Sequence, residues 1–188
     1  MSLPGSTGVR RTMIVGVGLG VIAAAVAGGY AAARRDKDAF SRSTIDVGIV
    51  VSDIEKAAAF YKNALGFREV PGFDVSAKMG AGSGLTDGHA FRVRVFILKL
   101  ESTATKIKLI EFPKVPSKKV DHQFIHSSLG YSYLTIFVSD TTAAVERARK
   151  AGAVFVKDEP YRLSDGTRYL TLVRDPDGNI IELVGPKK

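Results

Sequence analysis

Residue types that carry chemistry are sparse in this sequence. There is no cysteine, which excludes disulfides, thiolate nucleophiles and a cysteine-based zinc site in this chain. The three histidines, His89, His122 and His126, fall in regions with the character of loops or strand ends. No nucleophile stands beside a base in a recognisable pattern. No local motif in the sequence therefore indicates a particular reaction.

Gly16, Gly18 and Gly20 look like a dinucleotide-binding fingerprint, but their context does not fit one. No strand precedes them, no strand–helix–strand unit encloses them, and no acidic residue follows at the expected distance in a second strand. Because they lie in an apolar stretch, we interpret them as small residues that suit helix packing in lipid.

That apolar stretch, Met13–Ala33, contains no charged residue. A helix of this length reaches roughly 30 Å, the thickness of the hydrocarbon core of a bilayer. It follows a short basic region (residues 1–12) and precedes a linker (residues 34–43). Two interpretations remain open, an uncleaved single-pass anchor and a signal peptide. Either one predicts a membrane-anchored or exported protein of a bacterial cell envelope or periplasm.

The net charge of +8 does not indicate nucleic-acid binding. Four of these charges come from the arginine pairs that flank the apolar stretch. A further cluster, Lys114, Lys118 and Lys119, lies in a proline-punctuated loop and is not accompanied by a nucleic-acid-binding motif. We interpret this cluster as solvated surface and expect no nucleic-acid partner.

The remainder of the chain repeats one pattern of elements. Thr44–Ser52 alternates as a strand, with Ile45, Val47, Ile49 and Val51 on one face. Ser52 and Glu55 form a capping-box pattern before a helix whose buried stripe is Ile54, Ala57, Ala58, Tyr61 and Leu65, and which stops at Gly66. The strands predicted next are Phe67–Val75, Phe91–Leu100 and Lys106–Phe112, with a glycine-rich loop (Gly80, Gly82, Gly84 and Gly88) after the first of them.

The second half follows the same plan. Tyr131–Val138 predicts a strand, Ser139 and Asp140 cap a helix that buries Ala143, Val145 and Ala148, and Gly152 ends that helix. The remaining predicted strands are Val154–Lys157, Arg168–Arg174 and Ile180–Val184. We therefore predict an α+β domain over residues 44–185. Its two βαβββ modules, residues 44–112 and 130–185, form a cupped mixed sheet with helices on the outer face, behind an N-terminal apolar helix.

Three strings in this order, VGIVVSDIEKAAAFYKNALGF, LTIFVSDTTAAVERARKAGA and RDPDGNIIEL, resemble the vicinal oxygen chelate (glyoxalase) superfamily. The resemblance covers roughly residues 44–185. The superfamily includes glyoxalases, extradiol dioxygenases, epimerases, thiol transferases acting on fosfomycin, and bleomycin-binding proteins. Its members often form homodimers, and this sequence does not exclude one.

In the catalytic members, four inward-facing side chains hold a divalent metal. The resemblance places these positions at Asp46, Lys108, Tyr133 and Glu182. If the register slips, Glu111 replaces Lys108, although strand alternation aims Glu111 at the other face. A lysine repels a divalent ion, and tyrosine is neutral at pH 7. We therefore expect no cofactor and no metal; Asp46 and Glu182 are the ligands if one is found.

We hypothesise a polar cluster in which the Lys108 ammonium lies between Asp46 and Glu182, with Tyr133 as a hydrogen-bond donor. The favoured function is binding of a small molecule in the cup, with Phe137 and Arg94 as further contacts and an anionic ligand if Arg94 faces inward. The alternatives are a metal-independent lyase, isomerase or transferase using Lys108, Tyr133 and Glu182, and an anchored protein-interaction domain.

Overall fold

The computed structural model describes residues 41–101, 103–112 and 114–188. Residues Thr44–Lys188 form one compact unit. The apolar segment predicted at residues 13–33 lies outside the described residues, and with it the predicted N-terminal helix. Within the described residues, no helix is long and apolar enough to cross a bilayer.

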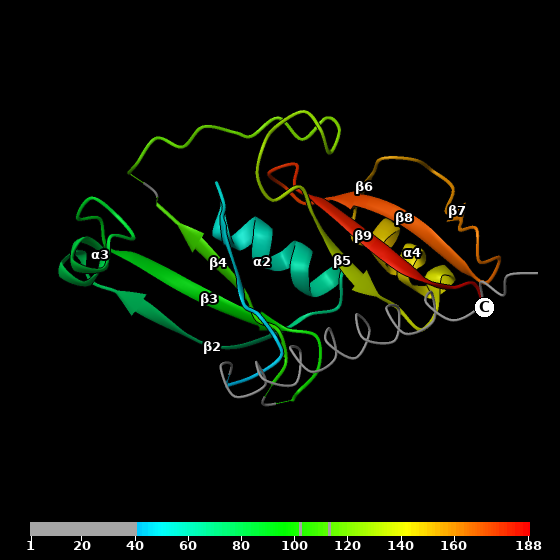
Figure 1. Cartoon of the computed structure of the whole chain (residues 1–188), viewed down its shortest axis with the longest axis horizontal. Helices are drawn as coiled ribbons and strands as arrows, with labels where there is room; N and C mark the ends of the chain where they lie inside the picture. The colour runs from blue at the N-terminus through cyan, green and yellow to red at the C-terminus, as the bar shows by residue number, and fades with distance from the viewer. Residues whose placement is uncertain (1–40, 102, 113) are drawn as a thin grey trace, which may run out of the picture. The chain divides into compact units, whose positions relative to one another are not determined.

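The first half of the unit is a four-stranded sheet with one long helix and one short one. The order of strands across this sheet is β1-β4-β3-β2, with β1 parallel to β4 and the other pairs antiparallel (Figure 1). Its elements are β1 (Val47–Val50), α2 (Ile54–Asn63), β2 (Arg68–Val75), α3 (Ala77–Ser83), β3 (Phe91–Ile97) and β4 (Ile107–Glu111).

The second half builds a separate five-stranded sheet. Its strand order is β5-β9-β8-β6, and β7 pairs with β8 outside this path. The elements are β5 (Tyr133–Phe137), α4 (Thr141–Lys150), β6 (Val154–Phe155), β7 (Tyr161–Arg162), β8 (Arg168–Arg174) and β9 (Ile180–Pro186). The predicted α+β architecture of two repeated units is confirmed, but the hydrogen bonding makes two sheets and not one.

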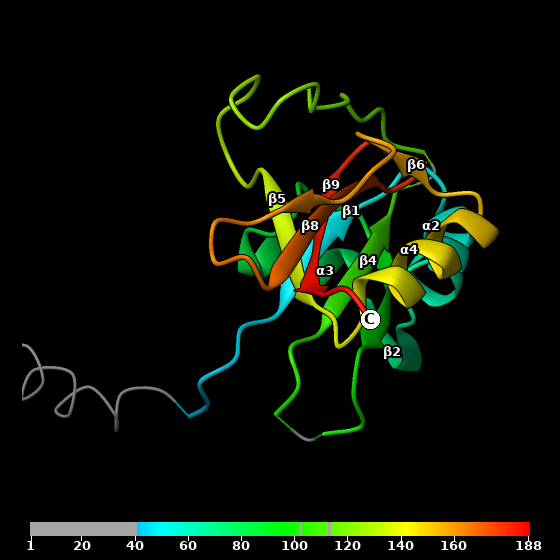
Figure 2. The same cartoon turned by 90° about the vertical axis from the view of Figure 1, so that its right-hand side faces the viewer.

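One hydrophobic core joins the two halves. Helix α2 contributes Ala57 and Tyr61 to this core, and helix α4 contributes Ala148. The two sheets contribute side chains such as Leu109 and Ile181, and all five residues are fully buried. Figure 2 shows α2 and α4 side by side on one side of the sheets. Since apolar side chains from both sheets and both helices share this core, the halves are packed as one body.

Backbone contacts strengthen the same junction. Arg147 of α4 donates from Nε to the carbonyl of Ala64 and from Nη2 to that of Leu65, at 3.1 and 3.3 Å. These carbonyls follow the last turn of α2, where orphan acceptors lack helical partners. The cationic side chain therefore caps the end of one helix from the surface of the other.

Helix α2 begins one residue later than the capping-box pattern predicts, whereas α4 begins within the predicted cap of Ser139 and Asp140. Asp53, not Ser52, is the N-cap of α2 and accepts hydrogen bonds from the backbone amides of Glu55 and Lys56. Asp140 is the N-cap of α4. The predicted inward side chain Ala143 is exposed, and Ala144 is buried in its place.

The glycine-rich segment predicted as a loop contains helix α3. The Ser76 side chain caps its start by accepting from the amide of Met79, and Gly84 ends it with φ of +75°. Gly80 is buried here, and a methyl group on it would lie 3.1 Å from the carbonyl oxygen of His89. Close packing thus stabilises a helix that its composition disfavours.

Candidate functional site

The two sheets each have one face against the shared core and one face turned away from α2 and α4, which we call the distal face. In the first sheet, Gly48 and Val95 are the register partners of Lys108, so Lys108 shares their face. The neighbouring Leu109 points into the core. Strand alternation therefore places Lys108 on the distal face, as the sequence predicts.

Asp46 and Lys108 form an ion pair on this face. Lys108 Nζ lies 3.0 Å from Asp46 Oδ2, and the side chains are 31% and 13% exposed. The other carboxylate oxygen of Asp46 accepts from the backbone amide of Lys106 at 3.3 Å. A small apolar cluster of Val75, Val93 and Val95 lies on the same face. The pair is thus partly sheltered from water, which strengthens its attraction.

The distal face of the second sheet carries Glu182. Its Oε2 accepts a hydrogen bond of 2.6 Å from the hydroxyl of Thr135, its register partner on β5. Tyr133 and Phe137 lie two residues to either side of Thr135 and so share its face. Phe137 is 73% exposed and Tyr133 is also exposed. Large apolar surface is therefore open around this carboxylate.

The structure brings the predicted polar residues together as two pairs. Lys108 contacts Asp46, and Glu182 contacts Thr135. Among the described residues, no ion pair joins Lys108 to Glu182, and Tyr133 donates no side-chain hydrogen bond to either pair. Within one chain, the hypothesised cluster is therefore present only as the Asp46–Lys108 pair, and Glu182 is not part of it.

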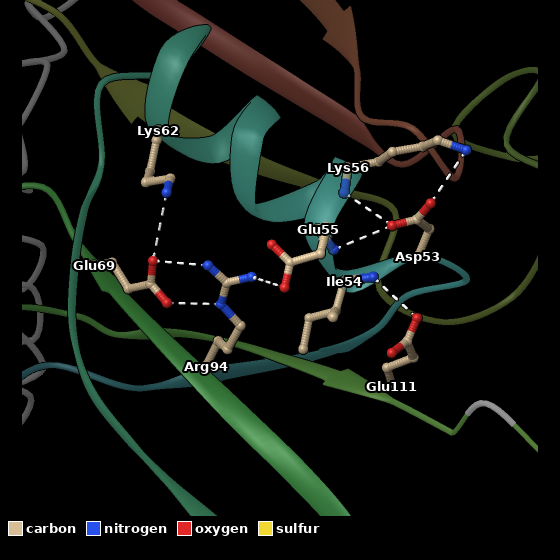
Figure 3. Close-up of polar contacts among 8 residues, drawn as sticks. All are labelled: Asp53, Ile54, Glu55, Lys56, Lys62, Glu69, Arg94 and Glu111. Atoms are coloured by element: carbon tan, nitrogen blue, oxygen red, sulfur yellow. Dashed lines mark hydrogen bonds and ion pairs between the residues drawn. The ribbon is translucent and has the colours of Figure 1, made fainter.

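Arg94 does not line the distal face, which corrects the prediction for this residue. Its register partner is the core residue Leu109, and its guanidinium faces α2 (Figure 3). Arg94 Nε and Nη2 donate to the two carboxylate oxygens of Glu69 at 2.6 and 2.8 Å, and Nη1 lies 2.8 Å from Glu55 Oε1. The contact with Glu55 clamps α2 onto the sheet, and the two-point contact with Glu69 joins β2 to β3 within the sheet.

The contact between Arg94 and Glu69 shifts the pKa of both groups. The hydrogen bonds from Arg94 lower the pKa of the Glu69 carboxyl, and Lys62, 3.6 Å away, adds to this effect. The same contact with Glu69 raises the pKa of Arg94. The Glu69 carboxylate and the Arg94 guanidinium therefore remain charged in the folded protein at neutral pH.

Glu111 also belongs to the helix-facing side of the sheet. Its Oε1 accepts a hydrogen bond of 3.1 Å from the backbone amide of Ile54, in the first turn of α2 (Figure 3). A carboxylate in this position satisfies an orphan amide and complements the helix dipole. The register that places Lys108 rather than Glu111 on the distal face is therefore the one observed.

The donor set at the four positions implied by the resemblance does not fit a divalent metal. Lys108 is a cation with no free lone pair when protonated, and its partner Asp46 already neutralises it. Tyr133 is a poor ligand unless deprotonated. In the part of the chain that the structure describes, no three histidine, aspartate or glutamate side chains gather as a metal site. We derive no chemistry through a metal here.

The turn at residues 175–179 is a polar junction between the halves. Buried Asp175 accepts from the amides of Asp177 and Asn179, and the Tyr61 hydroxyl lies 3.5 Å from its Oδ2. Burial raises the pKa of Asp175 and that of Tyr61. Asp177 in turn accepts from the amide of Ser52 at 3.0 Å. The string RDPDGN, with its closely spaced aspartates, is the signal for this turn.

Comparison with known proteins identifies the family. The model of the Glyoxalase/Bleomycin resistance protein/Dioxygenase superfamily matches residues 45–183, well over half of the chain. Among the curated proteins, none matches.

Solved structures with the same fold come from several organisms. A glyoxalase family protein from Bacillus cereus is 22% identical over 79% of this chain and 96% of its own, with a TM-score of 0.63. The glyoxalase I of Leishmania major, described as trypanothione-dependent, is 24% identical over 77% of this chain and 87% of its own, with a TM-score of 0.54. At these identities the likeness is one of fold.

Proposed function

We propose that this chain, which belongs to the Glyoxalase/Bleomycin resistance protein/Dioxygenase superfamily, binds a small oxygen-bearing molecule at its distal faces without a divalent metal. The observation that carries the proposal is the Asp46–Lys108 ion pair, which stands where the resemblance implies metal ligands. An ammonium supplies positive charge at that point, although it supplies no coordination positions for a substrate.

Lys108 is the group that contacts the ligand in this proposal. A protonated lysine has three N–H donors, and one of them is directed to Asp46. Because the Lys108 side chain is 31% exposed, its other donors are accessible to a carbonyl or carboxylate oxygen. Since Arg94 faces the helix, the preference for an anionic ligand depends on Lys108 alone. The nearby valines and Phe137 provide apolar contact for the carbon skeleton.

A second copy of the chain completes the pocket. Val50, Tyr133 and Phe137 are large side chains that the distal faces leave exposed. Each face holds half of the predicted polar set, the Asp46–Lys108 pair on one sheet and Glu182 on the other. We infer that a homodimer sets the first sheet of one copy opposite the second sheet of its partner, and that this covers the apolar surface and unites the polar groups.

The location of the domain is part of the same proposal. The uncharged stretch Met13–Ala33, with arginine pairs on both sides, supports a membrane anchor or an export signal. The binding domain is then held at a bacterial membrane or released into the periplasm.

Ligand binding is tested by a thermal-shift screen followed by calorimetry. The screen contains small carboxylates, phosphates and dicarbonyl compounds. A hit is expected to bind the natural chain, to lose affinity about 10-fold or more in Lys108→Met, and to keep it in Lys99→Met, which removes a lysine that is 78% exposed and lies outside these faces.

Two outcomes contradict the proposal. If hits bind equally well to Lys108→Met, the ligand lies elsewhere. If no compound binds and the chain co-purifies with one membrane protein in a fixed ratio, an interaction domain replaces the binding function.

A further inference from the structure

The loop between the two halves of the domain exposes an unusual amount of apolar surface. We call residues 114–131 the connecting loop. Leu129 and Tyr131 are fully exposed, Phe124 is 56% exposed, and Val120 and Ile125 are similarly open to solvent. Figures 1 and 2 both show this segment as a long arch that stands away from the two sheets. Five large side chains in water within one short loop indicate a surface that another phase or molecule covers.

The same loop is basic. Lys114, Lys118 and Lys119 are exposed, and Asp121 is its single acidic residue. Within the described part of the chain, no ion pair neutralises these three lysines. The Asp121 carboxylate accepts the backbone amide of Gln123 at 2.8 Å. The loop therefore presents a net positive charge together with its apolar side chains.

The apolar tip of the loop is held in place and is not a free tail. Arg174 of β8 donates from Nη1 to the carbonyl of His122 and from Nη2 to that of Gln123, at 2.6 and 3.0 Å. The amide of Phe124 donates to the Ser127 hydroxyl at 3.0 Å, and the Phe124 ring stacks on that of His126. These contacts order the backbone before any partner binds, which lowers the entropic cost of docking.

We propose that the connecting loop docks on an anionic lipid surface, with Phe124, Ile125 and Leu129 in the interfacial layer and the lysines among the headgroups. Aromatic and aliphatic side chains enter the boundary between headgroups and acyl chains, and each nearby lysine adds attraction to anionic lipid. A loop whose first part carries the lysines and whose second part carries the bulky apolar residues fits this two-part surface better than a protein partner, because interface cores are depleted in lysine.

This docking is independent of how the N-terminal segment is processed. If Met13–Ala33 stays in the chain as an anchor, the loop orients the domain against the same bilayer. If that segment is removed, the loop is itself a peripheral attachment site. The proposed lipid site and the proposed ligand site are separate, because Lys108 and Glu182 lie outside the connecting loop.

A single tryptophan reports on the loop, because the natural chain contains none. The full chain carrying Phe124→Trp is mixed with vesicles of phosphatidylcholine alone or of phosphatidylcholine with phosphatidylglycerol, each including a brominated lipid that quenches tryptophan. Phe73→Trp is the matched control, since Phe73 is also an exposed phenylalanine, 48% exposed, but lies on β2. Leu129→Trp is a second reporter in case the first variant is poorly folded.

The expected result is a blue shift and a quenching several-fold larger for Phe124→Trp than for Phe73→Trp, in the vesicles with phosphatidylglycerol. Adding Lys118→Glu and Lys119→Glu should abolish most of this difference, while Lys78→Glu with Lys99→Glu should not. Equal quenching of the loop and control reporters overturns the proposal, as does the absence of any association with vesicles. A blue shift that needs only higher protein concentration and no lipid also overturns it, because a second copy then covers the loop.

Discussion

At the scale of single residues, the Asp46–Lys108 pair is the central feature of the candidate site. Its two charges are 3.0 Å apart and partly sheltered, so each lowers the cost of burying the other. The Asp46 carboxylate also accepts from the backbone amide of Lys106, so removing the lysine takes away its ammonium partner but not this hydrogen bond.

A double-mutant cycle measures this coupling. Lys108→Met, Asp46→Asn and the double variant are compared by urea unfolding. We expect Lys108→Met alone to cost about 1–2 kcal/mol and the coupling energy to be about 1 kcal/mol, because the pair is neither fully buried nor fully exposed. Lys99→Met serves as the control with a change near zero. Additive effects of the two single substitutions contradict a direct interaction.

Strand alternation explains why this pair was predictable and Arg94 was not. Thr44–Ser52 has an unambiguous apolar face, which fixes the side to which Asp46 points. In the run FRVRVFI, the valines and the arginines alternate, and either set fits a face that is only partly covered. The choice is made by Glu69 and Glu55, which come from other elements and hold Arg94 against α2.

At the scale of elements, the Arg94 clamp and the β2 bulge set how α2 and the sheet edge meet. Glu69 is brought to Arg94 by the pairing of β2 with β3, and Glu55 by the first turn of α2. Between Val70 and Phe73 the β2–β3 register shifts. Gly72, within this irregularity, lies so close to β3 that a methyl group would be 2.0 Å from the carbonyl oxygen of Val93.

The clamp predicts a pH dependence of stability. The folded protein holds the pKa of Glu69 below its unfolded value of about 4.3, so the stabilisation is complete above that pH and is lost as the pH falls below it. Glu69→Gln should cost about 1 kcal/mol at pH 7 and progressively less between about pH 5 and pH 3. Chemical unfolding at several pH values tests this, with Glu101→Gln as the control. A cost that is constant with pH contradicts the assignment.

Two glycines give opposite predictions for the same substitution. Gly72→Ala should destabilise by about 1–3 kcal/mol, because the new methyl group meets backbone that cannot move aside. Gly82→Ala, in α3, has open space at its Cβ and should stabilise by up to about 1 kcal/mol through better helix propensity. Urea unfolding of both variants measures the two changes in the free energy of unfolding. Equal effects of the two substitutions are inconsistent with the bulge geometry.

The differences between the predicted and the observed helices show which features the local sequence does not determine. The repeated pattern of strand, cap, helix and glycine was sufficient to find α2 and α4, because their apolar stripes are regular. It missed α3, since a segment with glycines at 80, 82 and 84 has poor helix propensity and gains its stability from packing around Gly80. It also chose Ser52 over Asp53, two adjacent residues of almost equal capping strength.

At the scale of the whole domain, two separate sheets lie against one shared core and leave their distal faces open. Three strings of sequence were enough to predict the superfamily architecture, since their order is that of the two modules. The arrangement of the second sheet relative to the first depends on contacts such as those of Asp175 and Tyr61, 114 positions apart in the chain. No local pattern encodes such a contact.

The open faces predict self-association. The full chain in detergent should have a protein mass of twice 20.1 kDa by light scattering coupled to size exclusion. Phe137→Asp places a charge in the proposed interface and should give the monomer, whereas Leu100→Asp, at a similarly exposed apolar residue in the turn between β3 and β4, should not. A monomeric natural chain, or a dimer unaffected by Phe137→Asp, excludes this interface.

Elemental analysis of the natural chain tests the central claim most directly. The purified full-length protein, exchanged into metal-free buffer without chelators, is measured for iron, zinc, manganese, nickel and cobalt, beside the Asp46→Ala and Glu182→Ala variants. If a lysine ammonium has replaced the metal, every element should be far below one equivalent in all three proteins. One equivalent of a divalent ion in the natural chain, lost in either variant, would contradict the account.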